Sequence, residues 1–271
     1  MAPLGAGALT PGHALAIGGA FGALSLTASA MYLVNDVWDK DKDRLHPAKR
    51  HRAIASGRLS PRVALVSAGA LLVPAGIVSW AVSPAFFAIV GAYFVAAMLY
   101  SFWLKTAPAI DIVMLAGFFV LRIVGGGIAV QVDVSSWLLA TSFFVFLSIA
   151  AAKRVIELQV MEPSLDGGPV GGRGYVSSDR DVVLAAGVGA GIASTLLLGL
   201  FVESGAASLS LQAPQLLWLS IPVWVYWVLR FWLIVSRGKV GHDPVEFVLK
   251  DWVSYLTVTV MVLLVYVAQG G

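Results

Sequence analysis

Long apolar runs dominate this chain, and short polar segments separate them. A helix needs about 20 mainly apolar residues to cross the hydrocarbon core of a bilayer. Eight runs meet this length approximately, at 14–35, 63–82, 85–104, 108–130, 136–156, 181–202, 214–235 and 247–268. Because 59% of the residues are hydrophobic, lipid must solvate much of the surface. The pattern predicts an all-α integral membrane protein with eight spanning helices, forming a single domain over residues 1–271.

Polar segments that contain Lys or Arg alternate along the chain, without exception, with polar segments that contain neither. Lys and Arg occur in the segments at about 36–62, 153–180 and 236–250 and at Lys105. The intervening segments contain neither residue type, and they lie near 83–84, 131–135 and 203–213. Because basic loops stay on the cytoplasmic side of a membrane, we expect the basic segments to cap a cytoplasmic site and both termini to lie outside. The protein is then a multi-pass protein of the cell membrane.

A group of acidic side chains stands where the first run leaves the membrane. Asn35, Asp36, Asp39 and Asp43 share one face of a continuous helix, whereas Asp41 points elsewhere. Carboxylates stacked in this way repel each other unless a cation joins them. Their hard oxygen atoms suit Mg²⁺, which also takes ligands from substrate phosphates. We therefore predict that all four residues bind Mg²⁺ and that the three aspartates on this face are catalytic.

A basic cluster follows at once, after Pro47, where we expect the helix to end. Lys49, Arg50 and Arg52 are anion-binding groups, and arginine can hold a phosphate in a bidentate fork. Together with the aspartates they predict a site for a diphosphate–Mg²⁺ group. The alternative is that the basic cluster only fixes the topology and contacts anionic lipid, while the aspartates balance its charge. Topology does not require four aspartates, which favours the site.

These residues resemble the first aspartate-rich motif of the UbiA superfamily of intramembrane prenyltransferases. The matching pattern is Asn35-Asp36-x-x-Asp39-x-x-x-Asp43, then His46-Pro47-x-Lys49-Arg50-x-Arg52 and Ala55-Ser56-Gly57. Ala53 stands where the family usually has proline. The resemblance implies a UbiA-like helical bundle.

A second motif indicates the branch of the superfamily. Members that prenylate aromatic rings carry another aspartate-rich motif in the loop equivalent to 153–180, and this chain has Lys153-Arg154-x-x-Glu157 there. That motif resembles the decaprenyl-phosphate phosphoribosyltransferases, as do the stretches around Tyr100 to Lys105, Asp111, Leu121-Arg122-x-x-Gly125-Gly126 and 241–251.

The branch resemblance also implies substrate contacts. Lys153, Arg154 and Glu157 are expected to bind substrate, and Tyr175 is a ribose or phosphate contact by family position alone. Members of the branch have nine spans, and the first ends in a Lys-Asn pair. This chain is expected to lack that span, either because its start is truncated or because the lysine is lost.

Several other polar residues are open to two interpretations. Lys105 either binds phosphate or only supports the topology. Asp111 is either a charge at the start of a helix or part of the site. Arg122 lies inside a span, where a charge indicates function by default, yet it would also satisfy carbonyl groups of a glycine-loosened helix. Arg230 either reaches the site or extends to lipid phosphate. Tyr100 belongs to the site only through the resemblance.

The resemblance implies Mg²⁺-dependent transfer of a 5-phosphoribosyl group from phosphoribosyl diphosphate to a polyprenyl phosphate. The product lies on the route to the arabinose donor of cell-wall polysaccharides. The enzyme alternative is a prenyltransferase that uses a prenyl diphosphate and an aromatic acceptor, and the missing second aspartate motif counts against it. A transporter would show charges along a pathway through the midplane or internal repeats; the charges here instead crowd one face, and no repeat is seen. No nucleic-acid partner is expected, and the oligomeric state, a homo-oligomer included, is left open.

Overall fold

A computed structural model describes residues 11–45, 49–160, 173–204, 207, 211–241 and 243–270, and these residues form helices and connecting turns without a strand. The long helices are α1 (Pro11–Trp38), α3 (Pro61–Val82), α4 (Pro84–Phe102), α5 (Ile110–Ala129), α6 (Ser136–Val160), α7 (Arg180–Glu203), α8 (Ser220–Ser236) and α10 (Trp252–Ala268). Two short α-helices are α2 (Lys40–Leu45) and α9 (Pro244–Lys250). Four 3₁₀ turns are η1 (Lys49–His51), η2 (Leu104–Thr106), η4 (Ser177–Asp179) and η5 (Pro214–Leu219).

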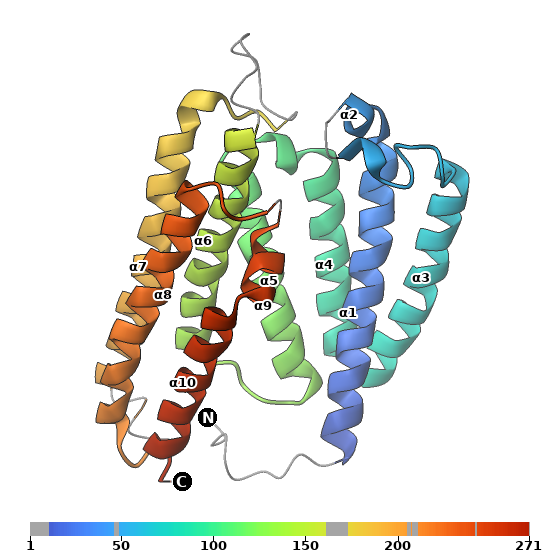
Figure 1. Ribbon diagram of the computed structural model, residues 1–271. Coiled ribbons are helices and arrows are strands. Elements are labelled where there is room, and N and C mark those ends of the chain that lie inside the picture. The colour runs from blue at the N-terminus through green and yellow to red at the C-terminus, as the bar shows by residue number, and fades with distance from the viewer. Residues whose placement is uncertain are drawn as a thin grey trace.

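The long helices stand side by side as one bundle, with α2 at one end and α9 farther in, toward the middle of the bundle (Figure 1). The opposite end holds the start of α1 and the end of α10. Helices α3 and α4 are joined by a tight, capped turn, because only Ser83 lies between them. Ser83 accepts a hydrogen bond from the Phe86 backbone N–H at 3.0 Å and Pro84 begins α4, so the turn both ends α3 and starts its neighbour.

The predicted spans agree with the structure except at the last one. Seven segments are long and apolar enough to cross a membrane, and η5 together with α8 forms the seventh. The expected continuous span at 247–268 is instead two helices, α9 and α10, bent by 70° at Asp251. Asp251 caps α10 by accepting from the Ser254 backbone N–H at 2.9 Å, and this cap starts a new helix direction. Counted as one span, the pair gives up to eight.

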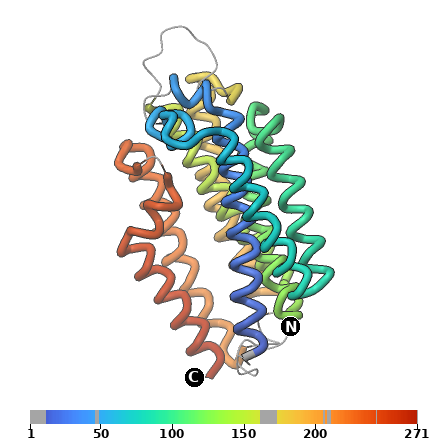
Figure 2. The backbone as a smooth tube through the Cα atoms, turned by 90° about the vertical axis from the view of Figure 1, so that its right-hand side faces the viewer, coloured from blue at the N-terminus to red at the C-terminus, as the bar shows by residue number. Residues whose placement is uncertain are grey.

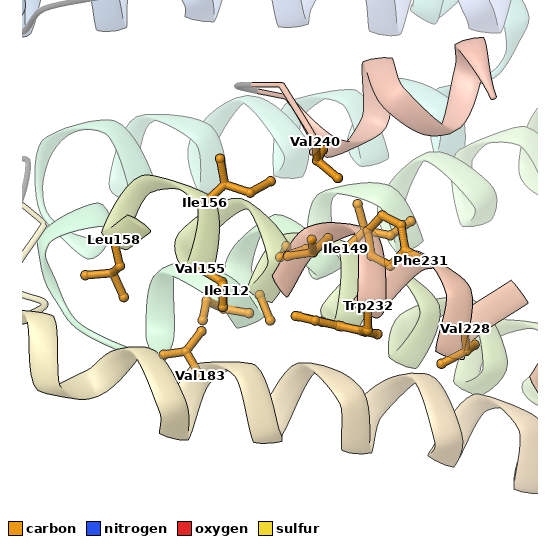
Figure 3. Close-up of a cluster of buried hydrophobic side chains, with 14 of the residues drawn as sticks. Ile112, Ile149, Val155, Ile156, Leu158, Val183, Val228, Phe231, Trp232 and Val240 are labelled. Atoms are coloured by element: carbon orange, nitrogen blue, oxygen red, sulfur yellow. The ribbon is translucent and has the colours of Figure 1, made fainter. Parts of the chain in front are cut away.

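Two large hydrophobic cores hold the bundle together, and a smaller cluster of Val202, Ala207, Leu217 and Ala268 lies apart from them in the described residues. One lies between α1, α4 and α5, and the other joins α5 and α6 to α7 and α8. Ile112, Val155 and Val183 come from three different helices and meet in the second core (Figure 3). Many large apolar side chains outside the cores are exposed, as a lipid-facing surface requires. In Figure 2, α8 and α10 form one edge of the molecule and α4 and α5 the other, with α1 between them.

Candidate functional site

A cavity of roughly 400 Å³ opens at the α2 end of the bundle, between α1, α4, α5, α6 and α9. Most of the residues predicted from sequence line it. They are Asn35, Asp36, Asp39, Asp43, Lys49, Arg52, Tyr100, Lys105, Arg122, Lys153 and Arg154. Apolar side chains form its deeper part, among them Met31, Ala97, Phe118 and Ile149. The cavity is therefore polar at one end and apolar toward the centre of the bundle.

The acidic residues occupy one wall of the cavity because the helical path continues past the end of α1. The Asp39 backbone N–H donates to the Asn35 carbonyl at 2.9 Å, and the Asp43 N–H donates to the Asp39 carbonyl at 2.8 Å. The predicted common face is thus present, and the Asp41 side chain, 91% exposed, points away from it. Pro47, where we expected the helix to end, lies outside the described residues.

Two cations divide the acidic wall between them. Arg52 Nη1 donates to Asp36 at 2.8 Å and to Asp43 at 2.9 Å. Lys105 Nζ donates to Asn35 Oδ1 at 3.0 Å and to both Asp39 carboxylate oxygens at 2.7 and 2.6 Å. Within the described residues, no three His, Cys, Asp or Glu side chains stand together as a ready metal site. The oxygen donors fit a hard cation chemically, but in this arrangement they face protein cations.

Burial lowers the pKa of two lysines that line the cavity, Lys105 and Lys49. Desolvation is the main cause for Lys105, and its hydrogen bond to Asp39 opposes the shift only in part. Desolvation also lowers the pKa of Lys49, where Glu157 is the strongest opposing charge. Their ammonium groups are thus poorly hydrated and would gain from an incoming anion.

Arg154 forms the opposite wall, and two carboxylates fix its position. Its side chain is 1% exposed; Nε donates to Asp111 and Nη1 donates to Glu157. Its third nitrogen, Nη2, is buried and has no hydrogen-bond partner in the described part of the chain. A buried guanidinium N–H without a partner is costly. Because Arg154 lines the cavity, this wall offers a rigid donor for an anion.

The segment at 173–175 holds this wall in place. Arg173, which also lines the cavity, donates to the Tyr100 hydroxyl at 3.0 Å and approaches Glu157 at 3.5 Å. Gly174 has φ +75°, and a Cβ there would meet the Thr106 carbonyl oxygen, so this turn requires glycine. Tyr175 is buried, and its hydroxyl donates to Asp111 at 2.6 Å.

Tyr175 therefore lies behind the cavity wall instead of facing a substrate. Its hydroxyl also accepts the Ala109 backbone N–H at 2.8 Å. Burial and the bond to Asp111 raise the pKa of Tyr175. Asp111 and Glu157 lie in the same second layer, where they orient Arg154.

Three other predicted residues differ in their placement. Arg50 is exposed and donates to His51 at 3.3 Å. Arg230 forms a bidentate ion pair with Asp251, with both hydrogen bonds at 2.8 Å, and it is not among the residues that line the cavity. Lys153 lines the cavity 3.9 Å from Asp243.

Arg173 and Asp243 also line the cavity, and no site role was predicted for them from the sequence. Asp243 caps α9 by accepting from the Val245 N–H at 2.8 Å, and Pro244 follows it at the first helical position. Asp-Pro before an apolar segment is a helix-start signal, so the sequence contained a clue to this short helix.

Fold and site together define a multi-pass helical membrane protein with a polar, charge-lined cavity at one end of its bundle. A family profile described as the UbiA prenyltransferase family matches residues 2–254. The chain belongs to this family and is a transferase of UbiA type.

Curated relatives of this chain carry three different names. The chain is 30% identical over 234 residues to a protein named decaprenyl-phosphate phosphoribosyltransferase from Mycolicibacterium smegmatis, covering 86% of this chain and 73% of that protein. It is 30% identical over 243 residues to nodulation protein NoeC of Azorhizobium caulinodans, covering 88% and 78%. It is 31% identical to the uncharacterized protein y4nM of Sinorhizobium fredii, covering 87% of this chain but only 46% of y4nM.

Solved structures share the fold at low sequence identity. A UbiA homolog from Archaeoglobus fulgidus bound to GPP and Mg²⁺ superimposes with a TM-score of 0.69 at 15% identity, covering 93% of this chain and 88% of that one. A digeranylgeranylglyceryl phosphate synthase superimposes with a TM-score of 0.61 at 13% identity, covering 95% and 91%. The membrane bundle predicted from the sequence is thereby confirmed at the level of fold.

Proposed function

We propose that the protein transfers the 5-phosphoribosyl group of phosphoribosyl diphosphate to a polyprenyl phosphate. The observation that carries the proposal is Arg154, a buried arginine on the cavity wall with one nitrogen left for an anion. Arg154 lies across the cavity from the aspartates. Superfamily members that prenylate aromatic rings have a second aspartate-rich motif in the equivalent loop, so an arginine at this wall favours a different reaction. A donor with a diphosphate at one end and a phosphate at the other suits two separate charged walls. The mycobacterial relatives named decaprenyl-phosphate phosphoribosyltransferase support the same assignment.

The chemical step asks little of the protein beyond positioning and charge. An oxygen of the lipid phosphate forms a bond to C1 of the ribose, and the bond between C1 and the diphosphate oxygen breaks. The electron pair leaves with diphosphate, and no proton has to move because a phosphate monoester is already anionic near neutral pH. Lys49, Lys105 and Arg154 would hold the phosphates and reduce the repulsion between two anionic substrates.

The acidic wall is the proposed Mg²⁺ site, on Asn35, Asp36, Asp39 and Asp43. When bound there with the donor, Mg²⁺ would neutralise the charge that develops on the leaving diphosphate. The carboxylates now paired with Arg52 and Lys105 would exchange those partners for the metal. Arg52 and Lys105 would then be released to bind phosphate oxygens. Before substrate and metal bind, the same two cations would neutralise the carboxylates.

We place the α2 end of the bundle at the cytoplasmic face of the cell membrane, as the distribution of Lys and Arg predicts. The segments at 36–62, 153–180 and 236–250 would then cap the site. The product would be a polyprenyl-phosphoryl-5-phosphoribose, a precursor of an arabinose donor.

The test is a transfer assay in membranes that contain the full chain. Radiolabelled phosphoribosyl diphosphate and polyprenyl phosphate are supplied with Mg²⁺, and label in the lipid extract is measured. We expect a lipid-soluble product that EDTA abolishes and that Asp39→Asn reduces at least about a hundredfold, the scale of losing a charge-stabilising group. Lys239→Gln, an exposed substitution outside the cavity, is the matched control and should leave the rate unchanged.

A parallel arm tests the prenyltransferase alternative. A labelled prenyl diphosphate is offered with an aromatic acceptor under the same conditions. Transfer in this arm, with phosphoribosyl diphosphate inert, would reject the proposed reaction in favour of the alternative.

A further inference from the structure

Arg122 is a cation far inside the bundle. It stands 12 residues after Ile110, the first residue of α5, which is about 18 Å along the helix axis at 1.5 Å per residue. Its Nη2 donates to the Tyr93 hydroxyl at 2.7 Å. Its guanidinium carbon lies 5.2 Å from the centre of the Tyr93 ring and 5.1 Å from that of Phe119.

These contacts stabilise Arg122 without neutralising it. A phenol hydroxyl and two ring faces are favourable partners for a guanidinium, but none carries a negative charge. Among the described residues, no carboxylate forms an ion pair with Arg122. An unpaired charge within a membrane span is expensive and is kept where it serves a function. The structure therefore calls for an anion that the described residues do not supply.

The position of Arg122 indicates where this anion comes from. A second cavity, of roughly 440 Å³, runs along α1 and α5, and Arg122 and Ala28 line both it and the polar cavity. The rest of its lining is almost entirely apolar: Ile17, Ala20, Phe21, Leu24, Ser25 and Gly126. Arg122 thus marks the boundary between a charged chamber and an apolar groove.

We propose that Arg122 binds the anionic headgroup of an isoprenoid lipid phosphate whose tail lies in the α1–α5 groove. A guanidinium holds phosphate oxygens in a planar fork, and only Nη2 is engaged with Tyr93. Side chains on a helix lean toward its N-terminus, which in α5 is the end near Lys105 and Asp111. The headgroup is thereby presented to the polar cavity from the membrane side.

This assignment gives the donor and the acceptor of the proposed reaction separate binding groups. The role of Arg122 in catalysis therefore rests on the proposed function. The cations near the acidic wall and Arg154 remain available for the phosphates of the donor. Arg122 then selects the acceptor, because a neutral prenyl alcohol of equal length would leave its charge unpaired. The selection concerns binding and can be measured without any transfer reaction.

The first experiment measures binding of geranylgeranyl phosphate and of geranylgeraniol to the purified full chain in lipid nanodiscs, without phosphoribosyl diphosphate. We expect the phosphate to bind more tightly than the alcohol, and Arg122→Gln to remove about tenfold or more of that preference, the scale of one charge-assisted contact. Arg122→Lys should restore part of it. Arg237→Gln removes an exposed arginine outside both cavities and should change nothing.

Equal binding of phosphate and alcohol by the wild-type protein, or an unchanged preference in Arg122→Gln, would overturn the assignment. A preference that depends on Arg122 in a protein that does not use phosphoribosyl diphosphate would uphold it and reject the proposed reaction instead.

A second measurement needs no variant. A geranylgeranyl phosphate with a photoreactive group on its first isoprene unit is irradiated with the wild-type protein, and the attachment sites are mapped. We expect labels on α1 near Ala28 and on α5 near Gly126, and competition by unlabelled phosphate but not by the alcohol. Labelling confined to other outer surfaces would reject the groove.

Discussion

At the scale of single residues, the site depends on the buried arginine Arg154 and its buried partner Asp111. Arg154 and Asp111 have side-chain exposures of 1% and 0%, so neither can find water if the other is removed. The charges were visible in the sequence as Lys153-Arg154-x-x-Glu157 and as Asp111. Their pairing was not, because 43 positions separate Arg154 from Asp111.

Replacing Arg154 should therefore reduce stability as well as activity. We expect Arg154→Gln to lower the free energy of unfolding by on the order of 3 kcal/mol, because it leaves Asp111 charged and without its cation. Asp111→Asn in the same chain should recover part of that loss, with a coupling of about 1 kcal/mol or more. Thermal unfolding of the four proteins of this double-mutant cycle in detergent provides the measurement. Strictly additive effects would contradict the pairing.

Lys105 leads to a prediction about pH. Burial lowers its pKa from the ordinary value, and we assign phosphate binding to its protonated form. Activity should therefore fall as the pH rises, and the fall should begin at a pH below the ordinary pKa of lysine, about 10.4. Unfolding of the protein through deprotonation of Lys105 would not explain this fall in activity. A lysine with a lowered pKa binds its proton less tightly in the folded state, so its contribution to stability rises with pH.

The measurement is kcat/KM for phosphoribosyl diphosphate between about pH 7 and about pH 10, below the ordinary pKa of lysine. Lys105→Arg should move the alkaline fall to higher pH, because arginine stays protonated. Lys239→Arg, at an exposed position, should leave the profile in place. An unchanged profile in Lys105→Arg would show that another group titrates.

At the scale of helices, close packing of α7 depends on two glycines. A Cβ on Gly187 would lie 2.8 Å from the Ala151 Cβ and against the Trp232 ring, and one on Gly191 would lie 2.6 Å from Val228 Cγ1. Gly189, on the same helix, has no heavy atom within 4 Å of the position of a Cβ. Small residues at helix contacts allow close approach in membranes.

Gly187→Ala should therefore destabilise the protein by about 2 kcal/mol, the cost of overpacking. Gly189→Ala should be neutral or gain up to about 1 kcal/mol from the higher helix propensity of alanine. Thermal unfolding midpoints of the two variants and the wild type, compared under identical conditions, provide the test. Equal effects of the two substitutions would mean that α7 is packed differently.

The last span shows the limit of reading helices from apolar runs. The run at 247–268 predicts one helix, but the chain bends by 70° at Asp251. Asp251 binds Arg230, 21 positions away on α8, and caps α10 at the same time. Hydropathy along the chain contains no information on such a pairing. The bend matters to the site because it aims α9, with Pro244 and Val245, at the cavity.

At the scale of the whole molecule, the apolar runs and the distribution of charge were sufficient to predict a membrane bundle with its basic loops at one end. They also placed the aspartates on one face, because i, i+3 and i+7 positions share one face of an α-helix. The second cavity was not predictable. It arises from the packing of α1 against α5, and its lining residues look in the sequence like any other part of a span.

The junction between the two cavities allows the whole arrangement to be tested. Ala28 lines both, and a larger side chain there would close the passage from the groove to the charged chamber. We expect Ala28→Phe to lower kcat/KM for a long polyprenyl phosphate at least about tenfold, the equivalent of about 1.4 kcal/mol. A phosphate with one or two isoprene units should lose much less, because its tail does not need the groove. Ser29→Phe adds the same ring at the exposed neighbouring position and should affect neither acceptor. Equal losses for long and short acceptors in Ala28→Phe would show that the tail leaves the chamber by another path.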